Sequence, residues 1–237
     1  ARYHFADGRT FSYSSDLPEW LETIKEIDPV DIDGFLSFMR MGARIFEVSR
    51  NSFLQREPFA PPRREDLPGL WNFPLRGAWG NYARVIERTF RSPYLRQLFL
   101  RYPTYVGSSP YLTPSTLSII PYLEFAFGGW YVKGGLYRII ENLVELAKGL
   151  GVDFHFDSPV TGISSASGKV NGITVGGKDA WPADIVVSNC EVGDVAGLLG
   201  NRTAGRLKEQ DRSMSGFVLL LGARRDLPEL VHHQVYF

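Results

Sequence analysis

Residues 136–188 carry the pattern that most constrains the fold, because a helix signal there passes directly into short β-rich runs. Eight apolar residues recur at helical spacing over Leu136–Leu150, and Gly151 ends the pattern. Four runs rich in β-branched and aromatic residues follow, at Val152–Phe156, Val160–Ser164, Val170–Val175 and Ile185–Ser188. This succession predicts a mixed α/β region.

The first 127 residues carry signals for one hairpin and several helices. Asp7-Gly8 lies between Tyr3–Phe5 and Thr10–Tyr13, which predicts a β-hairpin. Asp16 offers an N-cap for a helix that should run to Ile27. Further helices are expected after Pro29, over Tyr82–Phe90, after Ser92, and over Ser115–Phe127 with a kink at Pro121.

The remaining signals divide the chain into parts. Five prolines within residues 57–75 predict a loop. Ser215–Leu221 and Gln234–Phe237 are expected strands that could pair with the hairpin. We therefore expect a mixed α/β (α+β) protein with a hairpin and helical region at 1–127, a helix-and-strand region at 128–195, and a return to the first sheet at 196–237.

Composition excludes several classes of function. The 237 residues have no net charge and no apolar run near the roughly 18 residues of a membrane-spanning helix, so neither nucleic-acid binding nor a membrane span is expected. Cys190 is the only cysteine, which fits a cytoplasmic setting and predicts a small buried side chain. The four histidines do not stand at ligand spacing, so no metal site is expected.

Charge is uneven along the chain. Residues 40–101 hold 12 arginines, 5 acidic residues and no lysine, interleaved with aromatic residues. Such a segment can lie against anionic lipid head groups or an acidic partner, which would place the protein at the membrane periphery. The favoured alternative is an ordinary solvated surface whose arginines lie over aromatic rings.

None of the 24 glycines belongs to a Gly-x-Gly-x-x-Gly turn, the usual means of holding the pyrophosphate of a dinucleotide. Gly149 and Gly151 come near, but Phe154 occupies the third position. Lys133-Gly-Gly, just before the helix signal, either offers free N–H groups to an anion or is simply a tight turn.

Several short motifs follow one another along nearly the whole chain. They are Asp28-Pro-Val-Asp-Ile-Asp-Gly-Phe-Leu-Ser-Phe, Leu95-Arg-Gln, Val106-Gly-Ser-Ser-Pro-Tyr, Gly129-Trp-Tyr-Val-Lys-Gly-Gly, and Leu219-Leu-Leu-Gly followed by His232-His233. In this order they resemble the bacterial phytoene desaturases, flavin-dependent enzymes among the amine-oxidase-like flavoproteins. Val132 departs from the proline that is usual in that family.

The resemblance implies a partial glutathione-reductase-like FAD domain and a substrate domain of antiparallel sheet and helices that holds an apolar isoprenoid. Lys133, Gly134 and Gly135 would lie near the flavin, and the backbone of Val160 would hold the adenine. Arg96 matches an arginine at the substrate end, with a helix-surface arginine as the alternative. The implied substrate contacts are Tyr102, Val106, Pro110, Tyr122 and Trp130.

The family's opening Gly-rich segment and its closing flavin-contacting segment have no counterpart in this sequence. The chain is therefore expected to be an internal fragment of a desaturase, inactive by itself and with weak or no affinity for FAD. Two alternatives stay open. One is another flavoprotein of that group, carotene isomerase-like or retinol-saturase-like, and the other is a non-enzymatic lipid-binding or membrane-docking module.

Overall fold

The computed structural model describes residues 1–57, 61, 63–65, 67–71, 80–200, 213–225, 227, 228 and 230–237. The chain divides into two compact units. Unit 1 combines residues 1–130 with 213–237, and unit 2 is formed by residues 131–212. The sequence pattern put the corresponding boundaries at 127/128 and 195/196.

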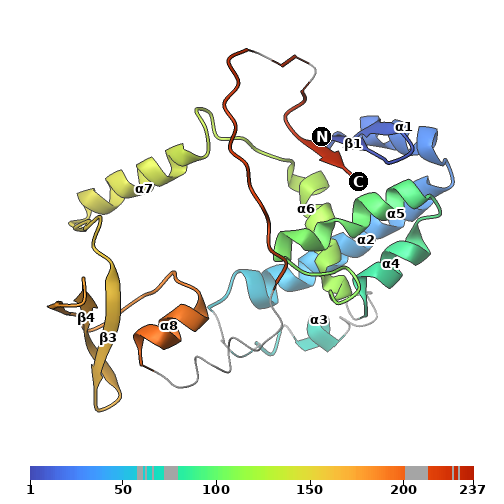
Figure 1. Ribbon diagram of the computed structural model, residues 1–237. Helices are drawn as coiled ribbons and strands as arrows, with labels where there is room; N and C mark the ends of the chain where they lie inside the picture. The colour runs from blue at the N-terminus through green and yellow to red at the C-terminus, as the bar shows by residue number, and fades with distance from the viewer. Residues whose placement is uncertain are drawn as a thin grey trace. The chain divides into compact units, whose positions relative to one another are not determined.

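A three-stranded sheet joins the two ends of the chain in unit 1. Its strands are β1 (Arg2–His4), β2 (Thr10–Ser12) and β6 (Gln234–Tyr236), in the order β2-β1-β6. The hairpin and the last strand were predicted correctly, and Figure 1 shows the N- and C-terminal ends side by side. The all-antiparallel arrangement was wrong, because β6 runs parallel to β1. A parallel pairing needs a long connection, which the intervening chain supplies.

The predicted helices of unit 1 are present. The Asp16 carboxylate accepts a hydrogen bond from the Glu19 N–H at 3.1 Å and so caps the first helix, as expected. The kink predicted at Pro121 is replaced by a change of helix type two residues earlier, where the 3-10 helix ending at Ser118 passes into the α-helix that begins at Ile119. The elements are α1 (Leu17–Ile27), α2 (Asp31–Ser49), the π-helix η1 (Arg50–Leu54), α4 (Tyr82–Thr89), α5 (Pro93–Leu100), the 3-10 helices η3 (Tyr102–Val106) and η4 (Ser115–Ser118), and α6 (Ile119–Phe127).

The predicted loop at 57–75 falls partly outside the described residues and partly on a helix. A short helix, α3 (Leu67–Trp71), lies within it. The N–H groups in the first turn of a helix have no acceptor within the helix, so a proline there costs no hydrogen bond. Pro68 lies in the first turn of α3 and is therefore compatible with this helix.

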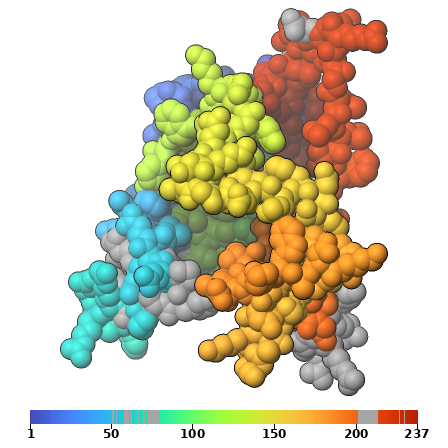
Figure 2. Space-filling view, turned by 90° about the vertical axis from the view of Figure 1, so that its left-hand side faces the viewer, coloured from blue at the N-terminus to red at the C-terminus, as the bar shows by residue number. Residues whose placement is uncertain are grey.

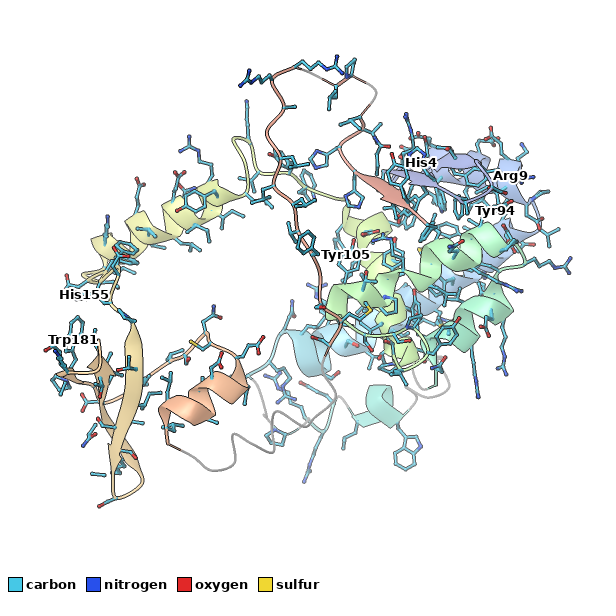
Figure 3. All side chains as sticks on the ribbon, in the orientation of Figure 1. His4, Arg9, Tyr94, Tyr105, His155 and Trp181 are labelled. Atoms are coloured by element: carbon cyan, nitrogen blue, oxygen red, sulfur yellow. The ribbon has the colours of Figure 1, made fainter. Side chains whose placement is uncertain are left out.

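An aromatic core holds the hairpin against the helices of unit 1. Trp20 of α1, Phe35 of α2 and Phe99 of α5 are completely buried in one cluster. Outside the core, Tyr94 of α5 receives the Arg9 guanidinium over its ring at 5.1 Å and donates a hydrogen bond to Asp7 at 2.5 Å, which ties the hairpin turn to α5 (Figure 3).

Unit 2 consists of α7 (Tyr137–Gly149), an antiparallel sheet and α8 (Val192–Leu198). Its strands β3 (Val160–Ala166), β4 (Lys169–Val175) and β5 (Asp179–Pro182) pair in that order. The first helix and the β3–β4 hairpin match the sequence prediction, whereas β5 and α8 were not predicted. His155 packs edge-on against Trp181 of β5, with ring centroids 4.6 Å apart (Figure 3).

Three predicted strands do not form. Val152–Phe156, Ile185–Ser188 and Ser215–Leu221 have no strand assignment, and several of their apolar side chains are exposed. A strand satisfies its backbone groups by pairing, and no described strand pairs with these runs, so β propensity alone does not make them strands.

The apolar face of α7 and Cys190 are also exposed rather than buried. The helix has no buried residue, and Figure 2 shows it at the surface as a yellow band. The lone cysteine was expected to be buried, but it lies in an irregular, exposed segment, where no packed element surrounds it.

Candidate functional site

The carboxylate of Glu124 in unit 1 accepts hydrogen bonds from three tyrosine hydroxyls. Tyr102, at the start of η3, donates to Glu124 Oε2 at 2.5 Å, and Tyr13, which follows β2, donates to the same oxygen at 3.0 Å. Tyr105, labelled in Figure 3, donates to Oε1 at 3.0 Å. The Tyr13 and Tyr102 hydroxyls are themselves 2.5 Å apart. Hydrogen bonds to an ionised acceptor are the stronger kind, so this network fixes α6 against the hairpin and η3.

Arg101 supplies the positive charge of the same cluster. Its Nη2 donates to the Tyr3 hydroxyl at 2.8 Å. Its guanidinium also lies over the rings of Tyr3, Tyr102 and Tyr105, at 5.5, 5.2 and 5.6 Å from their centroids. For Arg101, the last of the twelve arginines at 40–101, the expected contact with aromatic rings is present, and for the segment as a whole it stays a prediction.

The network keeps its phenols protonated. Burial, reinforced by the Glu124 charge, raises the pKa of Tyr13 and that of Tyr102 well above the ordinary value. Burial also raises the pKa of Tyr3 and of Tyr105, although the Arg101 charge opposes this in both. At neutral pH these hydroxyls therefore serve as neutral hydrogen-bond donors.

A pocket of about 380 Å³ opens beside this cluster. Its walls come from β1, the segment after β2, η3, α6 and the segment before β6, all within unit 1. The walls combine aromatic rings with a few convergent polar groups, as small-molecule sites usually do. The side chains in its wall include Tyr3, Tyr13, Arg101, Tyr105, Glu124, His232 and His233.

The five residues expected to contact substrate do not lie together in one site of the structure. Tyr102 is completely buried in the Glu124 network, whereas Val106 and Trp130 are exposed. The Pro110 carbonyl accepts a hydrogen bond from the Ala83 N–H. Tyr122 of α6 packs against the ring of Phe46. None of the five is among the residues that line the pocket.

Arg96 also lies away from the pocket wall. It sits half-buried on α5, and its Nε donates to the Phe90 carbonyl at 2.6 Å, which satisfies a carbonyl just beyond the end of α4. In the structure, Arg96 thus joins α5 to α4, and its predicted role at the substrate end stays a prediction.

The four residues expected to hold the cofactor all belong to unit 2. Gly134 and Gly135 form a turn with φ of 88° and 98°, immediately before α7. The N-cap position of α7, Leu136, carries no side-chain cap, so Lys133 and this turn stand at a helix N-terminus that suits an anionic group. Val160 is the first residue of β3, paired with Val175. The local geometry of the turn therefore fits a phosphate-bearing cofactor.

Sequence reasoning missed Arg101 and Glu124. One signal was available for Glu124, which is the only acidic residue between Glu87 and Glu141 and lies among apolar neighbours. A lone carboxylate on such a helix needs partners from elsewhere in the fold. No comparable signal distinguished Arg101 from the other arginines.

The part of the chain that the structure describes contains neither a metal-binding cluster nor a helix that could span a membrane. No group of three His, Cys, Asp or Glu side chains there could hold a metal ion. Likewise, none of the helices described is long and apolar enough to cross a membrane.

The sequence is similar to a family of flavin-containing oxidoreductases and to several curated carotenoid desaturases and oxygenases. The family described as flavin containing amine oxidoreductase matches residues 1–220. The chain is 32% identical to a 1-hydroxycarotenoid 3,4-desaturase of Flavobacterium sp. (strain P99-3), over 99% of the chain and 49% of that protein. It is 32% identical to a 4,4'-diapolycopene oxygenase of Methylomonas sp, over 100% of the chain and 48% of that protein.

A third relative is a zeta-carotene-forming phytoene desaturase of Myxococcus xanthus, 31% identical over 100% of the chain and 46% of that protein. The chain thus spans about half the length of the curated relatives it matches.

Proposed function

Because the chain belongs to the flavin-containing amine oxidoreductase family, we propose that it is part of an FAD-dependent desaturase that introduces carbon–carbon double bonds into an apolar isoprenoid polyene. The observation that carries this proposal is the similarity over the whole chain to proteins named for carotenoid and phytoene desaturation. Unit 1, with its aromatic core and pocket, would be the substrate side, and unit 2 would be part of a glutathione-reductase-like FAD domain.

In this proposal Lys133, Gly134 and Gly135 would hold the cofactor, together with the backbone of Val160. A bound flavin supplies a hydride acceptor. The chain's own contribution is to bind and orient: the turn before α7 would present N–H groups to an anion, and the aromatic rings of the unit 1 pocket would contact one end of a polyene.

The test uses the full-length protein in which this chain occurs, purified with FAD and supplied with phytoene in lipid vesicles. We expect a product that has lost pairs of hydrogen atoms and absorbs at longer wavelength, because the conjugated system lengthens. Unchanged phytoene and unchanged shorter-chain analogues, with the flavin bound, would rule out the desaturase assignment.

An oxygenase is the second candidate, since the 4,4'-diapolycopene oxygenase matches as closely as the first desaturase. Mass spectrometry of the product separates the two reactions, because desaturation removes hydrogen and oxygenation adds oxygen.

Peripheral membrane contact is a separate proposal, for which the arginine-rich segment at 40–101 is the support. Flotation of the protein with anionic vesicles should be lost as salt is raised. Equal recovery with neutral vesicles would count against it.

A further inference from the structure

We propose that the pocket beside Glu124 and Arg101 binds the hydroxyl-bearing end of an otherwise apolar substrate. This inference rests on the proposed function, because it names the kind of polyene end that unit 1 would select. Unused hydrogen-bonding groups, the charges of the pocket wall and the pocket volume together favour such an end group.

The pocket wall offers an unused acceptor position on Glu124 and unused N–H donors on Arg101. An ionised carboxylate offers about four acceptor positions. Oε2 of Glu124 accepts from Tyr13 and Tyr102, whereas Oε1 accepts only from Tyr105 among the described side chains. Oε1 therefore retains room for one further donor.

Arg101 has donors to spare. A guanidinium carries five N–H donors. Nη2 of Arg101 donates to Tyr3, and Tyr105 is a second hydrogen-bond partner of the guanidinium. Its Nε is inaccessible and does not face the pocket, so the donors left for a ligand are the remaining Nη N–H groups. A hydroxyl group both donates and accepts, so it can donate to Glu124 and accept from Arg101, whereas a carbonyl can do only the second.

Charge and size restrict the ligand further. The side-chain charges of Arg101 and Glu124 balance each other in the pocket wall, so a charged ligand would find no unpaired side-chain charge of the opposite sign there. A volume of about 380 Å³ is near the lower end of the range for small-molecule sites, so it suits an end group rather than a whole polyene. The rings of Tyr3, Tyr13 and Tyr105 offer apolar contact to the adjoining hydrocarbon.

The pocket should therefore discriminate by polarity. An apolar end would displace water from Glu124 and Arg101 without replacing its hydrogen bonds, and sites built to bind a hydroxyl reject such analogues strongly.

The experiment compares two acyclic polyenes that differ only in a terminal hydroxyl group, using the full-length protein with FAD. The wild type should show a kcat/KM at least about tenfold higher for the hydroxylated polyene, as expected for one lost hydrogen bond to a charged group. Arg101→Met should raise KM about tenfold for the hydroxylated polyene and so reduce the preference for it over the apolar polyene. The same substitution at exposed Arg88, which does not line the pocket, should change neither the KM nor the preference.

A second measurement does not depend on how Arg101→Met folds. A short isoprenoid alcohol should inhibit the wild-type enzyme competitively, and the hydrocarbon of the same skeleton should not. Equal kinetics for both polyenes, or equal inhibition by both short compounds, would overturn the inference while the desaturase assignment stood. Conversion of neither polyene would instead contradict the proposed function.

Discussion

At the scale of single residues, Asp31 joins two helices with one buried carboxylate. It lies in the first turn of α2 and is 1% exposed. Its two oxygens accept hydrogen bonds from the backbone N–H groups of Arg91 at 2.6 Å and Ser92 at 2.8 Å, and Ser92 is the N-cap of α5. The side chain thus satisfies donors that the start of α5 would otherwise leave unpaired.

Asp31→Asn should lower the free energy of unfolding by about 1–3 kcal/mol, because an amide donor would then face a backbone N–H. Urea denaturation of the purified chain measures the change. Asp33→Asn is the matched control, since Asp33 is exposed in the same helical turn and loses only the favourable charge at the helix start, worth about 0.3–1 kcal/mol. Equal losses in the two variants would show that the buried hydrogen bonds add nothing.

Three tyrosines, two of them in the Glu124 network, predict a stability limit at high pH. The third, Tyr82 of α4, is completely buried and donates to the Phe99 carbonyl at 2.9 Å. The pKa values of Tyr13, Tyr82 and Tyr102 are raised by burial, so the folded chain binds more protons than the unfolded chain above the ordinary tyrosine pKa. Their contribution is complete below a pH of about 10 and decreases as pH rises above it. Phenolate absorbance should show these three ionising together with unfolding, after the exposed tyrosines. Ionisation of all 11 tyrosines near pH 10 in a chain that keeps its near-ultraviolet circular dichroism would contradict this.

At the scale of elements, Gly42 lets α2 approach α6. A Cβ built at this position would lie 2.5 Å from the Tyr122 Cβ and 3.0 Å from the Ser118 carbonyl oxygen. Neither atom is the end of a flexible side chain, so relief requires a shift of one helix. The close packing of α2 against α6 therefore depends on glycine at position 42, which has no side chain.

Gly42→Ala should destabilise the chain by about 1–3 kcal/mol through overpacking, although alanine favours helix more than glycine does. Gly193→Ala in α8 is the control, because a Cβ there meets nothing within 4 Å, and it should not destabilise. Urea denaturation of both variants decides the sign. A Gly42→Ala chain as stable as the wild type would mean that α2 and α6 can separate at no cost.

Elements that are determined by residues close together in the sequence could be predicted from it. Asp7-Gly8 and the Asp16 cap act locally, so the hairpin and α1 were predictable. Ile185–Ser188 and Ser215–Leu221 have β propensity, but a strand also needs a partner that propensity does not specify. The site follows the same rule. Tyr102 was expected at the site from the family resemblance, whereas Arg101 and Glu124 come to line one pocket only through the tertiary fold.

At the scale of the whole molecule, FAD affinity depends on how much of a cofactor site one chain contains. The turn before α7 offers a single helix N-terminus to an anion, and no Gly-x-Gly-x-x-Gly turn occurs in the sequence to hold a pyrophosphate. The apolar face of α7 and the run at Ile185–Ser188 are exposed, so the described part of unit 2, residues 131–200, presents no closed apolar wall to a flavin ring.

We therefore expect the purified chain to bind FAD weakly or not at all, with dissociation constants above about 100 μM, equivalent to less than about 5.5 kcal/mol of binding free energy. Flavin fluorescence and the visible spectrum during an FAD titration measure this, with the full-length protein as the positive control. Weak binding by the chain and tight binding by the full-length protein would assign most of the affinity to residues outside this chain. Tight binding by the chain alone would mean that the turn at Lys133–Gly135 and the strands of unit 2 suffice, and Gly134→Val, which adds a branched side chain at a φ of 88°, should then abolish it.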